Sequence, residues 1–101
     1  MALPRQSRTI LVDYKVSAVI DKNQNMLVPF YLMCSYAYYK LDTPIISDHL
    51  FDDMSKRLLE NYDEIEHWHK HLITRGDLEA GTYLGEYPER VINGLSHFIR
   101  S

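Results

Sequence analysis

Two adjacent tyrosines and two carboxylates one helical turn apart form the clearest chemical pattern in this sequence. Tyr38 and Tyr39 close one apolar stretch, and Asp48 and Asp52 open the next. Residues at i and i+4 share one face of a helix, so both carboxylates should lie beside the apolar stripe. Carboxylates accept hydrogen bonds from ribose hydroxyls, and tyrosine rings offer flat faces for stacking a heterocycle. The segment 38–53 is therefore predicted to form a ligand corner that suits a nucleoside better than a polymer.

The residues around this corner follow an ordered pattern. Its members are Tyr38, Tyr39, Asp42, Pro44, Ser47, Asp48, Phe51, Asp52 and Leu58. The pattern resembles the small helical N-terminal domain, called Ia, of bacterial NAD-dependent DNA ligases. In that family an aromatic or histidine pair precedes an Asp-x-Pro turn and a helix that opens Asp-x-x-Tyr-Asp. The resemblance extends over about residues 29–60 and implies a two-helix clamp for the nicotinamide mononucleotide half of NAD.

By this resemblance the aromatic residues would stack on the base and the acids would hold ribose hydroxyls. The implied ligand-binding residues are Tyr38, Tyr39, Asp48, Phe51 and Asp52. Two additional contacts are expected from helix positions alone: Ser55 continues the face of the two acids, and Tyr31 falls to one side of the core stripe.

The sequence departs from the ligase pattern in two ways. Phe51 stands where the family has tyrosine, so stacking could survive while one polar contact is lost. A ligase also needs an adenylation domain with a Lys-x-Asp-Gly motif, and 101 residues leave no room for it. Lys40-Leu41-Asp42-Thr43 lacks the glycine of that motif. Ligase activity is therefore not expected.

The predicted function is a non-catalytic binding module for NAD or an NAD-derived nucleotide of the ADP-ribose type. One use would be sequestration of a signalling nucleotide by a viral counter-defence protein. The alternative is a protein-interaction module with an exposed patch of Tyr31, Tyr36, Tyr38 and Tyr39, since tyrosine is enriched at interfaces. A third hypothesis is an enzyme that acts on the nucleotide through Asp48 or Asp52. No cofactor is expected to be required.

Other residues with chemical potential have simpler interpretations. Glu60, Glu64, His67 and His71 follow a helical spacing that resembles metal-binding bundles. They point away from the apolar stripe, so a solvated surface without a metal is expected. Cys34 lies on a core stripe and is predicted to be a buried, inert thiol. Trp68 is predicted to lie in the core or at a dimer interface.

Composition limits the class of protein. The chain has 46% apolar residues and a formal charge of −3, which predicts one domain and makes nucleic acid an unlikely partner. A single cysteine excludes an intramolecular disulfide. No apolar run is long enough to span a bilayer, so no membrane association is expected. These features predict a cytoplasmic protein, which would lie in the host cytoplasm if it is viral. A homodimer and a complex with a protein partner are further options.

The expected fold class is α+β, mainly α-helical, with an N-terminal β strand or hairpin. Residues 1–8 should form a loose arm. The even positions from Ile10 to Ile20 are apolar, which predicts a half-buried strand over 9–20. Its partner is either a short strand at 26–28 or the same strand across a homodimer axis. The β element thus covers residues 9–28.

Helices are expected over the rest of the chain. Pro29 suits a first helical turn, and the following core stripe is Phe30, Met33, Cys34, Ala37 and Leu41. Pro44 should end this helix, and Ser47 should cap the next. The second helix either runs from about 48 to 73 or breaks at 61–63, which completes a helical pair within 29–75. Residues 76–101 should form a glycine-containing loop and a closing helix after Pro88.

Overall fold

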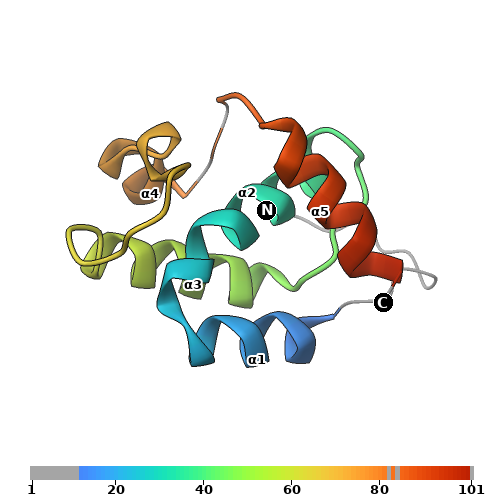
Figure 1. Cartoon of the computed structure of the whole chain (residues 1–101), viewed down its shortest axis with the longest axis horizontal. Helices are drawn as coiled ribbons and strands as arrows, with labels where there is room; N and C mark the ends of the chain where they lie inside the picture. Colours follow the sequence, from blue (N-terminus) through green and yellow to red (C-terminus); the bar gives the residue numbers. More distant parts are fainter. Residues whose placement is uncertain (1–11, 82, 84, 101) are drawn as a thin grey trace.

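Short helices surround one central helix in the computed structural model, which describes residues 12–81, 83 and 85–100 (Figure 1). The α-helices in chain order are α1 (Asp13–Lys22), α2 (Leu27–Tyr39), α3 (Asp48–Glu60), α4 (Arg75–Ala80) and α5 (Glu89–Arg100). Two short 3-10 helices lie between them, η1 (Gln24–Met26) and η2 (Lys70–Leu72). The mainly helical class is therefore confirmed.

The helix α2 lies at the centre because its sequence is apolar on every side. Its buried residues are Leu27, Val28, Phe30, Tyr31, Leu32, Met33, Cys34, Ser35 and Ala37. A helix that is hydrophobic all round has no face to offer to water and must be covered by its neighbours. The helices α1, α3 and α5 all pack against it (Figure 1). The predicted burial of Cys34 is confirmed.

The predicted N-terminal β element is wrong where the structure describes it. Residues 13–22 form α1, and no strand occurs in residues 12–81, 83 and 85–100. Val16 and Ile20, which looked like alternate strand positions, lie one helical turn apart and are the buried residues of α1. Tyr14, which a half-buried strand would also have buried, is 76% exposed. Residues 1–8 and 9–11 lie outside the described part.

The predicted strand at 26–28 is also wrong, because Leu27 and Val28 open α2. Pro29 lies in the first turn of that helix, as expected. The helix ends at Tyr39, well before Pro44, so the predicted stop is misplaced. Leu41 consequently lies beyond the helix and is 47% exposed rather than in the core stripe. Asp42 has a φ of 54°, a left-handed conformation that aspartate tolerates better than most residues, and it lies in the turn towards α3.

The start of α3 is held by two side chains. The Ser47 hydroxyl accepts a hydrogen bond from the Leu50 backbone N–H at 3.1 Å, which confirms the predicted cap. The Asp13 carboxylate accepts hydrogen bonds from the Ser47 backbone N–H at 2.8 Å and from the Ser47 hydroxyl. Because Asp13 lies in the first turn of α1, these bonds tie the starts of two helices together.

The chain after α3 differs from both sequence predictions. The helix stops at Glu60 with Asn61 as its C-cap, and only η2 follows before residue 74, so there is neither one long helix nor a second long piece. The helix α4 was missed inside the predicted loop. Its start is fixed by a capping box in which the Thr74 and Asp77 side chains each bond to the other's backbone N–H. The closing helix after Pro88 is present as α5.

Removing the Ser47 hydroxyl should destabilise the fold. Ser47→Ala loses the cap of α3 and one bond to Asp13, so we expect the free energy of unfolding to fall by about 1–2 kcal/mol. Urea denaturation would measure this loss. The control is Ser96→Ala, an exposed position on α5 that should change stability by less than about 0.5 kcal/mol. Equal urea midpoints for both variants would contradict the role of Ser47.

Candidate functional site

The predicted ligand corner is divided by the fold. Tyr38 and Tyr39 end α2, with their rings edge to face at a centroid distance of 4.9 Å, and both are half-buried. Phe51 of α3 stacks on Tyr31 of α2, with centroids 5.0 Å apart and ring planes 18° apart. Phe51 is 2% exposed and Tyr31 is fully buried. These two rings join α2 to α3 in the core, so their faces are not open to a ligand.

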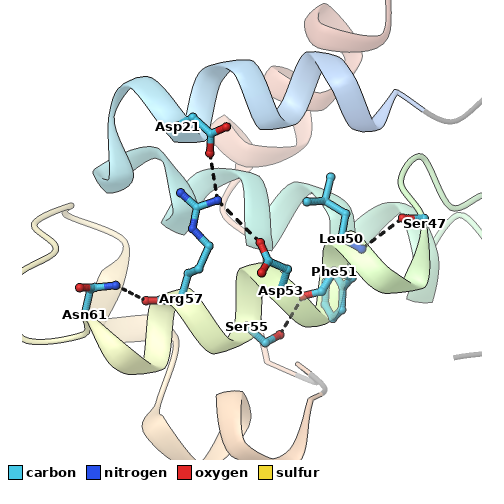
Figure 2. A network of polar contacts seen from close by, with 8 residues as sticks. All are labelled: Asp21, Ser47, Leu50, Phe51, Asp53, Ser55, Arg57 and Asn61. Carbon is cyan, nitrogen blue, oxygen red and sulfur yellow. Dashed lines mark hydrogen bonds and ion pairs between the residues drawn. The ribbon is translucent and has the colours of Figure 1, made fainter.

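Burial also governs the chemistry of Tyr31. It raises the pKa of Tyr31 to about 12, an effect partly offset by the nearby Ser55 hydroxyl. The two hydroxyls make no hydrogen bond of regular geometry, and the Ser55 hydroxyl donates instead to the Phe51 carbonyl at 3.2 Å (Figure 2). Ser55 is itself buried, so its main bond supports α3.

The two predicted acids have different surroundings. Asp52 is exposed and lines a cleft of about 380 Å³ with Ser55, Lys56 and residues of α4. Asp48 is half-buried, and its Oδ1 is buried without a hydrogen-bond partner among the described residues. Asp48 does not line that cleft, so the two acids do not converge on one cavity there.

The charged face of α3 is used to hold helices together. The Arg57 guanidinium lies 3.1 Å from the Asp21 carboxylate at the end of α1 and 3.7 Å from that of Asp53 (Figure 2). Such partly exposed ion pairs contribute roughly 0–1 kcal/mol each. Asp53 is thus engaged with Arg57.

A small tyrosine cleft lies at the end of α2. It has a volume of about 230 Å³ and is lined by Tyr39, Lys40, Tyr83, Gly85 and Tyr87. The Tyr83 hydroxyl donates to the Glu86 carbonyl at 2.6 Å, and the Tyr87 hydroxyl donates to the Tyr83 carbonyl at 3.3 Å. A Cβ at Gly85 would lie 2.6 Å from the Tyr83 hydroxyl oxygen, so only glycine permits this approach.

Tyr83 and Tyr87 were missed by sequence analysis because they fall in the segment predicted as a loop. The available signal was two tyrosines closely flanked by glycines and a proline. Burial raises the pKa of Tyr39, Tyr83 and Tyr87, with neighbouring acidic or tyrosine groups adding to the shift. Their hydroxyls therefore remain protonated at neutral pH and can donate hydrogen bonds.

A larger cleft opens at the other half of α2, and we call it the aromatic–histidine cleft. Its volume is about 500 Å³. Its lining residues come from η1, α2, the 67–69 segment and α5: Met26, Pro29, Phe30, Met33, His67, Trp68, His69, Arg90, Val91, Gly94, His97 and Phe98. The core position predicted for Trp68 is wrong, because α3 ends at Glu60 and leaves Trp68 in a turn where it is 67% exposed. The other option, a dimer interface, stays a prediction.

The neutral form of two histidines in this cleft, His67 and His69, is favoured. His67 Nδ1 accepts a hydrogen bond from the His69 backbone N–H at 3.1 Å, so this nitrogen carries no proton. His69 Nε2 is buried without a partner among the described residues. Burial lowers the pKa of both histidines, and neighbouring positive groups lower it further.

Metal binding by the glutamate and histidine series is not supported by the fold. Since α3 ends at Glu60, the spacing through Glu64, His67 and His71 no longer follows one helix. Within the described part of the chain, no three or more His, Cys, Asp or Glu side chains are grouped to hold a metal ion. No helix in that part has the length and apolarity to cross a membrane.

Comparisons with protein-family models, curated proteins and solved structures found no match for this chain.

The stability of the fold should depend on pH through His67 and His69. Their pKa values are lowered from 6.5, so between the native and unfolded pKa the unfolded chain binds more protons. Stability should thus be complete at pH values well above 6.5 and should fall as the pH drops through and below 6.5. Urea midpoints across this range would measure the slope.

A non-titrating variant should reduce this slope. His67→Asn supplies an amide oxygen as acceptor for the His69 N–H, and combining it with His69→Gln removes both titrations. The matched control is His49→Gln at an exposed position of α3, which should retain the wild-type slope. An unchanged slope in the double variant would show that other groups cause the pH dependence.

Proposed function

We propose that this protein is a non-catalytic binding module for NAD or an NAD-derived nucleotide, with the heterocycle bound in the tyrosine cleft. The observation that carries the proposal is the set of three tyrosines and one lysine around a single concavity. Tyrosine rings can stack on a heterocycle, and a lysine can contact a phosphate as a point charge. This arrangement keeps Tyr39 of the sequence prediction and adds Tyr83 and Tyr87.

The size of the cleft suits one ring rather than a whole dinucleotide. Its volume of about 230 Å³ is below the 300–1,000 Å³ typical of pockets that enclose a complete small ligand. We assign the base to the half-buried rings of Tyr39 and Tyr87, with Tyr83, which is 1% exposed, as the floor beneath them, and a phosphate to Lys40 at the exposed rim. The ribose would lie outside the cleft, on the surface near the end of α2.

The remaining predicted site residues take modified roles in this proposal. Tyr38 adjoins Tyr39 edge to face and supports its ring. Asp48 stays the proposed partner of a ribose hydroxyl through its half-buried carboxylate, although it does not line the tyrosine cleft. Asp52 lines a different cleft and becomes a weaker candidate. Phe51 and Tyr31 act from the core by fixing α2 against α3, without touching the ligand.

We propose binding without turnover because the described lining of the tyrosine cleft contains no carboxylate, histidine or cysteine to act as acid, base or nucleophile. A protein that only holds such a nucleotide could act by sequestration, and a viral counter-defence role in the host cytoplasm is the use we propose.

The alternative, a tyrosine patch that binds a partner protein, is less favoured. Tyr31 is buried and Tyr36 packs edge to face on Tyr87 at 5.1 Å, which leaves a much smaller patch.

Calorimetry with NAD, nicotinamide mononucleotide and cyclic ADP-ribose tests the proposal. At least one of them should bind, and Tyr39→Leu should weaken binding by about 5- to 100-fold, which corresponds to losing one base–aromatic stack. The control is Tyr14→Leu, since Tyr14 is 76% exposed on α1 and does not line the tyrosine cleft. Absence of heat with all three ligands at millimolar concentration would refute the proposal. Mass spectrometry of the nucleotide after incubation would reveal any turnover.

A further inference from the structure

The aromatic–histidine cleft combines an apolar floor with an exposed aromatic side. Phe30 of α2 and Phe98 of α5 meet edge to face in it, with centroids 4.9 Å apart, and Met26 and Met33 lie alongside. Trp68 is the only tryptophan of the chain and is largely exposed. A largely apolar concavity of about 500 Å³ has the size of a site for a complete small molecule.

The polar groups of this cleft are basic. Among its described lining residues are one arginine and three histidines but no carboxylate, although the chain as a whole carries a formal charge of −3. The Arg90 guanidinium lies 5.1 Å from the Trp68 ring centroid and forms no ion pair with a described carboxylate. Its charge is therefore available to an anion from solvent.

An unpartnered nitrogen points to a ligand independently of this charge pattern. His69 lines the cleft, and its Nε2 is buried with no hydrogen-bond partner among the described residues. A buried polar atom costs free energy unless it is hydrogen-bonded. An oxygen of a ligand could accept from this nitrogen when the proton is on Nε2.

From these three observations we propose that the aromatic–histidine cleft binds a small amphiphilic anion, with an aromatic or aliphatic body and one acidic group. The body lies on Phe30, Phe98 and Trp68, and the acidic group pairs with Arg90. This site is separate from the tyrosine cleft and does not depend on the proposed nucleotide.

A small molecule fits the cleft better than a protein surface does. A stable interface buries about 800 Å² on each partner, usually around a contiguous apolar patch. The large apolar side chains that are exposed in the described part are Tyr14, Leu41, Trp68 and Ile99. Of these only Trp68 lines the cleft, so the apolar surface available there is mainly the concavity itself.

A pair of dyes with nearly the same body tests both parts of the proposal. Anilinonaphthalene sulfonate carries one anionic group, and N-phenylnaphthylamine is its neutral counterpart. Dye fluorescence and energy transfer from Trp68 would report binding at this cleft. We expect the anion to bind about ten-fold more tightly than the neutral dye, as expected for a charge-assisted hydrogen bond. Equal affinities would overturn the assignment of an anion.

Two variants test separately the contribution of the Arg90 charge and the contribution of the cavity to dye binding. The first removes the charge. Arg90→Gln should reduce the affinity for the anionic dye by about ten-fold and leave the neutral dye unchanged. Its control is Lys22→Gln, an exposed cation on α1 that should affect neither dye. An equal effect of the two substitutions would indicate general electrostatic attraction and would overturn the role of Arg90.

Gly94→Leu should close the cavity. A Cβ at Gly94 meets only Met33 Sδ at 3.5 Å, so the added side chain extends into the cleft without a backbone clash. Leucine is also a better helix former than glycine, so the melting temperature should not fall. Both dyes should lose binding while the near-ultraviolet circular dichroism stays native. Binding that persists in this folded variant lies elsewhere and would overturn the proposal.

Discussion

The burial of α2 on every side is the constraint on which the rest of the structure depends. This helix has no polar face, so other elements must remove almost all of its surface from water. The short helices α1, α3 and α5 do so, and each needs its own terminal bonds because a short helix gains little from propensity alone. The Asp13–Ser47 contact is one such bond, and it serves the starts of α1 and α3 together.

The same constraint explains why the ligand corner differs from the sequence prediction. On a helix wheel Tyr31 falls outside the single apolar stripe and is expected to be accessible to a ligand. Because α2 is covered on every side, Tyr31 is instead buried in the core. Phe51 then becomes its stacking partner, and its lack of a hydroxyl suits this buried position. Tyr39, at the end of the helix, is left half-buried to meet the tail tyrosines.

Sequence reasoning succeeded where the signal was local. The Ser47 cap, the burial of Cys34 and the helix after Pro88 follow from short patterns and were confirmed. It failed where a pattern fits two periods or depends on distant contacts. Val16 and Ile20 satisfy both a strand and a helix, and packing on α2 decides between them. Neither cleft could be predicted, because each joins residues that lie far apart in the chain.

Two glycines account for the positions of the clefts. Several short helices and loops pack on α2. Where two of them meet and neither carries a side chain large enough to fill the space between them, a cleft remains. At one end of α2, Gly85 lets the chain pass against Tyr83, so the tail tyrosines stand beside Tyr39. On another side of α2, Gly94 of α5 faces Met33 without a side chain, and both residues line the aromatic–histidine cleft. The concavities are thus set by residues that contribute no chemistry, while the aromatic and basic side chains around them determine which ligands they suit.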